Sequence, residues 1–218
     1  MKVLITAGAT REPIDAVRFL SNVSTGRTGA ALAEVFTAAG HVVTLLHGEG
    51  AVMPQAGCVG ESFSSAGDLA AKLQRLLSAG NYDAVIMTAA VADYRPADPI
   101  QGKLSSEQND LTLRLVRNDK ILPRLKSFSP QPLGVIGFKL TVAADESTRR
   151  AAVDAQFAAG GVDLVVQNDL EEILGVPREE HPFRLYCSPD QAPEEIQGVA
   201  ALALAIAVIM RFGTSGSP

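Results

Sequence analysis

The chain has 218 residues and a formal net charge of -5, with 24 acidic against 19 basic side chains. This charge argues against a nucleic-acid partner, because proteins bind nucleic acids by neutralising their phosphates with Lys and Arg. The length favours one α/β domain over residues 1–212, and two isolated cysteines, Cys58 and Cys187, favour a reducing cytoplasm.

The predicted elements alternate between strands and helices. Strand-like apolar runs cover residues 2–7, 41–47, 84–88, 133–138 and 162–167. Helix-like runs cover residues 26–39, 67–78, 119–126, 144–159 and 193–212. Several strands are apolar without interruption, as expected when helices cover both faces of a sheet. The pattern therefore predicts an α/β fold with a doubly wound, mostly parallel, Rossmann-like sheet.

A long polar segment separates the first strand from the first helix. It runs from Gly8 to Gly26 and carries Arg18, Asn22 and Ser24. Connections of this kind are usually about two to six residues long. Because ligands bind at the carboxyl ends of the strands in open α/β sheets, we expect this segment to be a functional loop.

Residues 93–117 interrupt the alternation of strands and helices. Within them, residues 111–116 alternate between apolar and polar side chains at period two, and residues 183–187 read similarly. This period is typical of half-buried antiparallel strands. We expect both segments to belong to a small peripheral β appendage.

The C-terminal region contains an apolar run at residues 198–210. As a helix it would reach roughly 20 Å, short of the hydrocarbon core of about 30 Å in a bilayer. Glu194 and Glu195 follow Pro193 as in an ordinary helix start. The pattern predicts a helix over residues 193–212 that packs in the core, with no membrane partner. The polar tail at residues 213–218 is predicted to be disordered.

Residues 24–29, Ser-Thr-Gly-Arg-Thr-Gly, open the first predicted helix. Their hydroxyl and backbone N–H groups favour an anion-binding helix N-terminus. An ordinary capped helix, with Gly29 packed closely on the strand, explains them equally well. The spacing of a Walker P-loop is absent, and Gly8 stands eighteen residues before Gly26 rather than beside it, unlike a dinucleotide fingerprint.

Three further groups of residues lie at predicted strand ends or in mobile segments. Ala89, Ala90 and Asp93 follow the third strand, where small residues admit a ligand, although Asp and Pro are also common in turns. Lys103 is an isolated cation that could equally be a solvated surface residue. Gly137, Phe138 and Lys139 end another strand on the same rim.

Several of these segments together are similar to one family. The segments are Thr-Ala-Gly-Ala-Thr-Arg-Glu-Pro-Ile-Asp, Val-Arg-Phe-Leu-Ser-Asn-Val-Ser-Thr-Gly, Ala-Ala-Val-Ala-Asp-Tyr-Arg-Pro, Gly-Lys-Leu-Ser-Ser, Gly-Phe-Lys-Leu and Val-Val-Gln-Asn-Asp-Leu. In this order they resemble the phosphopantothenoylcysteine synthetases of coenzyme A biosynthesis. The resemblance runs from Lys2 to about Phe212 and implies a stand-alone synthetase without the decarboxylase domain.

The resemblance implies a ligase that joins 4′-phosphopantothenate to cysteine through an acyl-nucleotide, with release of pyrophosphate. It implies that Asn22, Arg18 and Lys103 are the catalytic residues, with the segment around Lys103 acting as a flap. It also implies Mg²⁺, with ligands unassigned, and a homodimer with residues 111–116 as the candidate interface. The implied nucleotide-binding residues are Gly8, Ser24, Gly26, Gly29, Ala89, Ala90, Asp93, Gly137, Phe138 and Lys139.

The sequence departs from the pattern of bifunctional bacterial members at Lys103-Leu104-Ser105-Ser106 and at Gly137-Phe138-Lys139-Leu140. These departures leave the nucleotide open, with CTP favoured and ATP an alternative. Two other classes remain open on the same fold. A nicotinamide-dependent reductase is disfavoured because Tyr94 is followed four residues later by Asp98 rather than Lys. A non-catalytic nucleotide-binding regulatory protein would not need Asn22 or Lys103.

Overall fold

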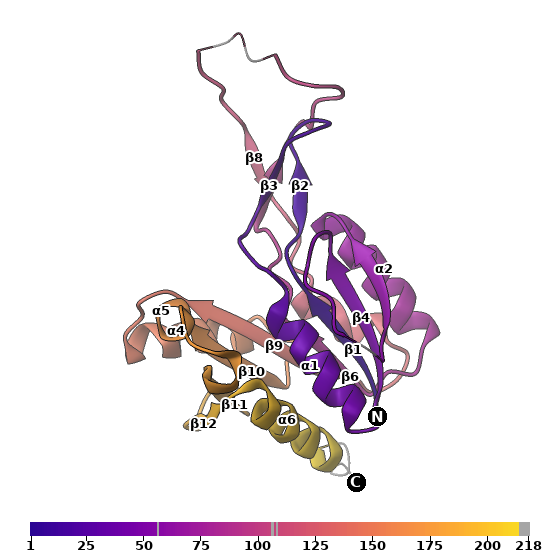
Figure 1. The fold of residues 1–218 in the computed structure, drawn as a ribbon, viewed down its shortest axis with the longest axis vertical. Helices are drawn as coiled ribbons and strands as arrows, with labels where there is room; N and C mark the ends of the chain where they lie inside the picture. The colour runs from indigo at the N-terminus through magenta and orange to yellow at the C-terminus, as the bar shows by residue number, and fades with distance from the viewer. Residues whose placement is uncertain (56, 106, 108, 214–218) are drawn as a thin grey trace.

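The computed structural model of the protein describes residues 1–55, 57–105, 107 and 109–213. Its largest feature is an eight-stranded sheet in the order β12-β11-β10-β9-β6-β1-β4-β5 (Figure 1). The strands are β1 (Lys2–Ala7), β4 (Val42–Gly48), β5 (Val59–Phe63), β6 (Ala84–Met87), β9 (Gly134–Thr141), β10 (Leu164–Asp169), β11 (Pro182–Tyr186) and β12 (Glu194–Gln197).

Six of these strands, from β5 to β10 in the sheet, are mutually parallel. Numbered along the chain, they follow the order 3-2-1-4-5-6, which is the order of dinucleotide-binding doubly wound folds. The order reverses between β1 and β6, and ligands in such sheets bind at this switch point. The predicted fold class is confirmed.

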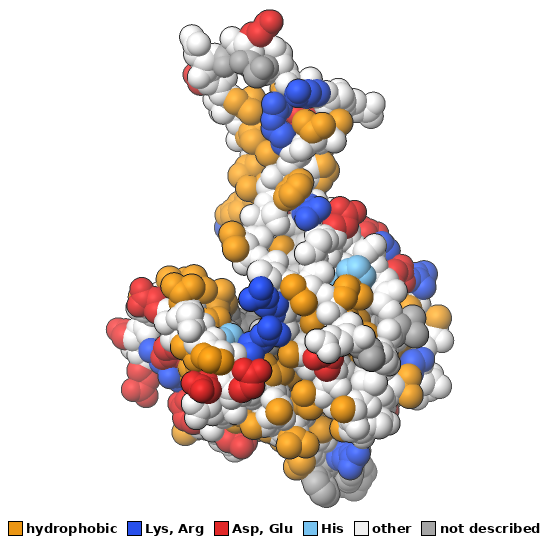
Figure 2. Space-filling model, viewed as in Figure 1, with side chains coloured by type: hydrophobic (Ala, Val, Ile, Leu, Met, Phe, Trp, Pro, Cys, Tyr) orange, Lys and Arg blue, Asp and Glu red, His pale blue; other side chains and the backbone are white. Residues whose placement is uncertain are grey.

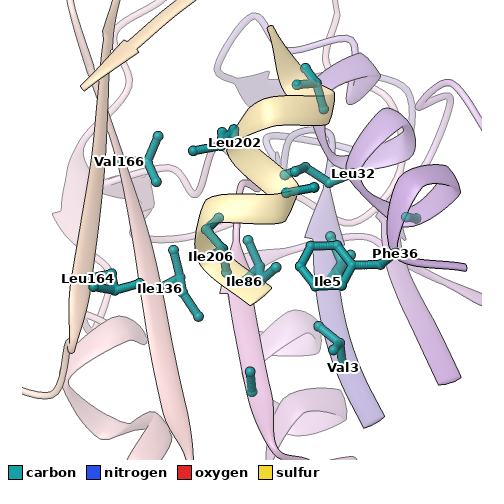
Figure 3. Close-up of a cluster of buried hydrophobic side chains, with 14 of the residues drawn as sticks. Val3, Ile5, Leu32, Phe36, Ile86, Ile136, Leu164, Val166, Leu202 and Ile206 are labelled. Carbon is teal, nitrogen blue, oxygen red and sulfur yellow. The ribbon is translucent and has the colours of Figure 1, made fainter. Parts of the chain in front are cut away.

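Helices cover both faces of the sheet. They are α1 (Arg27–Ala38), α2 (Ala66–Ala79), α3 (Leu125–Phe128), α4 (Glu146–Ala158), α5 (Leu170–Ile173) and α6 (Val199–Gly213), with short 3₁₀ turns η1 (Leu122–Arg124) and η2 (Arg178–Glu180). One face packs against α1 and α6, and the other against α2, α3 and α4. Figure 3 shows the first of these layers, where Ile5 and Ile86 of the sheet meet Phe36 of α1 and Ile206 of α6.

The C-terminal prediction was wrong at its start, because residues 194–197 form strand β12 rather than the first turn of a helix, and α6 begins at Val199. Ile196 is buried opposite Phe183 of β11, while Glu195 stays exposed and pairs with Arg184 at 3.1 Å. Gly198, at φ +84°, then turns the chain into α6. Strand pairing therefore outweighs the helix-start signal. Within the described residues, every helix is too short or too polar to cross a bilayer.

Two antiparallel ribbons form an arm that projects from the sheet (Figure 1). One ribbon pairs β2 (Arg11–Pro13) with β3 (Phe19–Ser21), and the other pairs β7 (Tyr94–Pro96) with β8 (Leu115–Arg117). The segment after β1 is thus a hairpin and not only a loop. Of the alternating run at residues 111–116, only the last two residues lie in a strand. Residues 183–187, expected in the appendage, instead form β11 of the main sheet up to Tyr186.

The arm is anchored at its base by two buried side chains. Glu12 of β2 is 2% exposed, and its Oε1 accepts a hydrogen bond from the N–H of Ala66 at the start of α2. The buried hydroxyl of Thr10 accepts one from the N–H of Ala92 at 3.0 Å. Of the tail predicted at residues 213–218, Gly213 is the last residue of α6, and residues 214–218 lie outside the described part of the chain.

Candidate active site

A cleft of about 1530 Å³ opens at the switch point between β1 and β6. Its floor joins the two segments that leave these strands, since the N–H of Ala90 donates to the carbonyl of Gly8 at 2.8 Å and the N–H of Thr10 donates to the carbonyl of Ala90 at 3.2 Å. The predicted site residues that line it are Asn22, Ser24, Gly26, Gly29, Ala89, Ala90, Asp93, Phe138 and Lys139.

Gly8 and Gly26 lie in close contact although they stand eighteen positions apart in the sequence. A Cβ placed on Gly26, whose φ is +74°, would lie 2.9 Å from the backbone nitrogen of Gly8. The β2–β3 hairpin is therefore an insertion between Gly8, which turns the chain after β1, and Gly26, which precedes α1. The two glycines lie as close together as they would if a short loop joined β1 to α1. The wide spacing of Gly8 and Gly26 in the sequence argued against a glycine-rich turn of the dinucleotide-binding kind, but the fold brings the two glycines together.

The N-terminus of α1 faces the cleft without a side-chain cap or an acidic residue in its first turn. Its orphan N–H groups and the positive end of its dipole are therefore available to an anion. Gly29 allows α1 to pack closely on β1, as the alternative explanation of this segment predicted. A Cβ at this position would lie 2.6 Å from the Cβ of Ala7. The helix thus lies tight on β1 and stays uncapped.

Two side chains connect the segments around the cleft. Asn22 is exposed, and its Nδ2 donates to the carbonyl of Val91 at 3.3 Å. Asp93 forms an exposed ion pair with Lys120, an interaction of little energetic value in water. A ligand that takes over either partner therefore loses little by breaking the pair.

Asp169 shapes the rim at the end of β10. It accepts hydrogen bonds from the Thr141 hydroxyl at 2.6 Å and from the N–H groups of Ala143 and Ala144. The Thr141 hydrogen bond is the largest effect on its pKa, and with the N–H groups it outweighs burial and lowers the pKa to about 2. These bonds hold the turn at Ala143, whose φ is +48°, and place the adjacent Asn168 on the cleft wall.

Arg18 and Lys103 lie on the arm and not among the residues that line the cleft. The Arg18 Nη1 donates to Asp15 Oδ2 at 2.6 Å, and the N–H of Leu104, next to Lys103, donates to the same oxygen at 3.0 Å. Burial alone would raise the pKa of Asp15, but N–H donors from Val17, Leu104 and Arg18 and the Arg18 charge lower it. Within one chain, the predicted catalytic residues Arg18 and Lys103 therefore lie on neighbouring segments of the arm. Neither of them lines the cleft of the same chain.

Gly137 also lies outside the lining, beneath the side chain of Gln156. Sequence reasoning included Arg27 only as part of the helix start at residues 24–29, and it assigned no role to several other cleft residues: Asn118, Lys120, Gln156, Asn168, Arg178 and His181. Arg27 follows the helix-opening glycine and Asn168 follows a predicted strand end, so position could have identified both. Arg178, which donates to the carbonyl of Arg27 at 3.3 Å, begins the short 3₁₀ turn η2, and its position in the sequence carries no such signal.

Comparison with known protein families shows to which family the chain belongs. The model of the DNA/pantothenate metabolism flavoprotein C-terminal domain family matches residues 1–211. The chain belongs to this family. A relative in the curated set, the coenzyme A biosynthesis bifunctional protein CoaBC of Thermococcus kodakarensis, is 34% identical over 170 residues. That match covers 78% of this chain but 41% of the relative, so the chain spans less than half of that protein's length.

Solved structures agree with the family assignment. A DNA/pantothenate metabolism flavoprotein from Streptococcus pneumoniae has a TM-score of 0.84 at 26% identity, covering 97% of this chain and 99% of that chain. A Cab2 mutant in complex with phosphopantothenate-cysteine has a TM-score of 0.77 at 20% identity, covering 99% of this chain and 89% of that chain. At 20% identity, the likeness to the Cab2 structure shows a shared fold and nothing more.

Proposed function

We propose that the protein joins 4′-phosphopantothenate to cysteine, using a nucleoside triphosphate, in coenzyme A biosynthesis. The observation that carries the proposal is the cleft at the β1–β6 switch point, lined by residues that the family resemblance assigns to the nucleotide. The names of the relatives support it. The Thermococcus protein is a coenzyme A biosynthesis protein, and the Cab2 structure holds phosphopantothenate-cysteine, the product of the proposed reaction.

The reaction has two steps. A carboxylate oxygen of 4′-phosphopantothenate attacks the α-phosphorus, and the bond to the leaving pyrophosphate breaks. The cysteine amine then attacks the acyl carbon, the mixed anhydride releases the nucleoside monophosphate, and the ammonium proton passes to solvent. This chemistry needs cations around the phosphates, donors for the acyl-phosphate oxygens and shielding from water.

The residues of the cleft match these needs. The uncapped N-terminus of α1 and the side chains of Arg27 and Arg178 offer positive charge to phosphates. Asn22, on the segment between the arm and α1, would hold the substrate carboxylate and the acyl-nucleotide through its amide. Asp93 and the backbone at Ala89 and Ala90 would contact the nucleotide.

We favour CTP as the co-substrate, with ATP as the alternative. Among the described residues, no group of three His, Cys, Asp or Glu side chains could hold a metal ion. Mg²⁺ is usually held by substrate phosphates, waters and only one or two carboxylates, so we propose that it enters bound to the triphosphate, where it neutralises phosphate charge.

The active form is proposed to be a cytoplasmic homodimer. Apolar side chains of the arm are exposed, among them Phe19 at 48%, Leu111 at 52% and Leu115 at 42%, and Figure 2 shows hydrophobic side chains along the arm. Exposed apolar patches of this kind mark protein–protein contacts. Because Arg18 and Lys103 lie outside the cleft of their own chain, we infer that the arm of one protomer reaches the cleft of the other.

The test supplies CTP or ATP with Mg²⁺, 4′-phosphopantothenate and cysteine, and measures pyrophosphate release and the mass of the amide product. Release that requires 4′-phosphopantothenate supports the synthetase. Absence of release with every nucleoside triphosphate would overturn it and leave a nucleotide-binding regulatory protein.

A further inference from the structure

One wall of the cleft has no buried apolar side chain to anchor it. Residues 168–181 form this wall, and Leu170, Ile173 and Arg178 are among those that line the cleft. The wall contains the four-residue helix α5, none of whose residues is buried. Because helices in proteins are held mainly by burying an apolar face, another interaction must hold this one.

The carboxylate of Glu172 anchors α5 from behind. Its Oε2 accepts a hydrogen bond from Arg184 Nη1 at 2.8 Å, and its Oε1 accepts one from Arg184 Nη2 at 3.1 Å. The same Oε1 pairs with Arg149 Nη1 at 3.0 Å. The Arg184 hydrogen bonds are the largest cause that lowers the pKa of Glu172, so the carboxylate stays ionised at neutral pH. Forked pairs between charged groups are among the strong hydrogen bonds of proteins, and this one joins α5 to β11 and α4.

A chain of hydrogen bonds connects this clamp with the rim of the cleft. Arg184 Nη1 donates to Gln167 Oε1 at 3.3 Å, and Gln167 Nε2 donates to the hydroxyl of Thr141 at 2.9 Å. That hydroxyl donates to Asp169 at 2.6 Å. Gln167, Thr141 and Asp169 are all buried. The start of the wall at Asp169 and its middle at Glu172 are therefore fixed by one connected network.

The far part of the wall carries Arg178, six positions after Glu172. Its Nη1 donates to the carbonyl of Arg27, the first residue of α1, at 3.3 Å. Within the described part of the chain, this is the one hydrogen bond of the guanidinium, so most of its five N–H donors stay free for an anion. They lie beside the uncapped N-terminus of α1.

We propose that Glu172 is a positioning residue for phosphate binding, which holds the wall so that Arg178 and the start of α1 contact the same phosphate group. This inference rests on the proposed use of a nucleoside triphosphate. Glu172 does not line the cleft, and its charge is the wrong one for a phosphate contact. Its effect on the ligand therefore passes through the wall. A wall that is ordered before binding raises affinity, because little freedom is lost when the phosphate arrives.

The sign of the change in affinity tests this role. Removing a negative charge near the cleft should, by electrostatics alone, strengthen the binding of an anion, whereas loss of positioning weakens it. Calorimetry measures the Kd of inorganic tripolyphosphate for the full-length protein and its Glu172→Gln variant. We expect the variant to bind tripolyphosphate about fivefold more weakly, within the range of couplings between residues of one network.

The matched control is Glu171→Gln, which removes the same charge from the same helical turn. Glu171 is exposed, and its carboxylate takes no part in the clamp. This variant should bind tripolyphosphate as tightly as the parent or more tightly. Arg184→Lys keeps the positive charge but cannot form the forked pair, so it should weaken binding as Glu172→Gln does.

A double variant separates positioning from a general loosening of the fold. In an Arg178→Gln background, Glu172→Gln should change the Kd of tripolyphosphate by less than about twofold, because the group that Glu172 positions is absent. Circular dichroism of each variant checks that the fold is retained.

Unchanged or tighter tripolyphosphate binding in Glu172→Gln would overturn the inference. Additive losses in the double variant would also overturn it, because Glu172 would then act independently of Arg178. Failure of the synthetase proposal looks different. In that case the parent binds tripolyphosphate with a Glu172-dependent Kd but releases no pyrophosphate from any nucleoside triphosphate.

Discussion

The carboxylate of Asp15 accepts a hydrogen bond from the backbone N–H of Leu104 at 3.0 Å, across 89 residues of chain. The same carboxylate pairs with Arg18 and closes the turn of the β2–β3 hairpin through the N–H groups of Val17 and Arg18. One buried anion thus holds together the two arm segments that carry the predicted catalytic residues Arg18 and Lys103.

Asp15→Asn should loosen the arm without changing the cleft. The neutral amide loses the charge that Arg18 needs and presents a donor where N–H groups already converge. We expect kcat for pyrophosphate release to fall about tenfold, because positioning of Lys103 is lost, while the Kd of nucleotide stays within about twofold. Hydrogen exchange of the amide of Leu104 should become faster. Asp98→Asn, in an exposed ion pair with Arg114, is the matched control and should change neither quantity.

Asn22→Asp should separate nucleotide binding from chemistry. The substitution keeps the shape but places a negative charge where the substrate carboxylate would lie. We expect single-turnover formation of the acyl-nucleotide to fall about a hundredfold, as for loss of one oxyanion donor, with nucleotide still bound. Asn81→Asp, an exposed site before β6, is the control. Equal losses of binding and chemistry would contradict the assigned role.

Two helical glycines predict opposite effects on stability. In Gly29→Ala the added methyl group would lie 2.6 Å from the Cβ of Ala7, so the free energy of unfolding should fall by about 1–3 kcal/mol. In Gly67→Ala of α2 the nearest atom is 3.8 Å away, so the helix should gain up to about 1 kcal/mol. Urea unfolding measures both, and a neutral Gly29→Ala would show that α1 does not need to lie tight on β1.

The stability of the fold should depend on Asp169 at acid pH. Because its folded-state pKa of about 2 lies below the ordinary value of 3.8, the ionised form stabilises the fold above pH 3.8, and this contribution is lost as the pH falls toward 2. Thermal melts from pH 2.5 to 7 should therefore show a steeper acid loss in the parent than in Asp169→Asn. The variant should also melt lower at pH 7, since its amide faces the N–H groups of Ala143, Ala144 and Glu171. Parallel curves would contradict this role.

Leu113→Glu should convert the proposed dimer to monomers. Leu113 is 37% exposed on the arm, and burying a carboxylate in an apolar contact is unfavourable. Light scattering measures the mass, and loss of activity should accompany dissociation if the arm acts in the neighbouring cleft. Leu204→Glu on the exposed side of α6, where Leu204 is 59% exposed, should leave the mass unchanged.

Much of the fold follows from local pattern. The run at Lys2–Ala7 is a strand at the predicted bounds because nearly all of its side chains are buried, and such strands read directly as apolar runs. The start of α1 was predicted from Gly26, which occupies the N-cap position of the helix. β5 was missed because Val59–Phe63 carries Gly, Glu and Ser and pairs only at the sheet edge.

The predicted site was harder to assemble because its parts meet through long-range pairing. No local pattern reveals that Thr10 hydrogen-bonds Ala92, or that short strands such as Phe19–Ser21 form an arm. The burial of Gln156 Nε2 without a hydrogen-bond partner among the described residues is likewise invisible in a sequence, since Gln on a helix is normally predicted to face solvent. Whether Arg18 and Lys103 act in a neighbouring cleft stays a prediction.

The hydrogen bonds at the base of the arm have a mechanical consequence. Thr10, at the base of the arm, is hydrogen-bonded to the peptide groups of Ala90 and Ala92, and both of these residues line the cleft. The arm is thus joined to the cleft by direct backbone and side-chain hydrogen bonds of Thr10. A change in the position of the arm that keeps these hydrogen bonds would therefore also move the backbone at Ala90 and Ala92, where the nucleotide is proposed to bind.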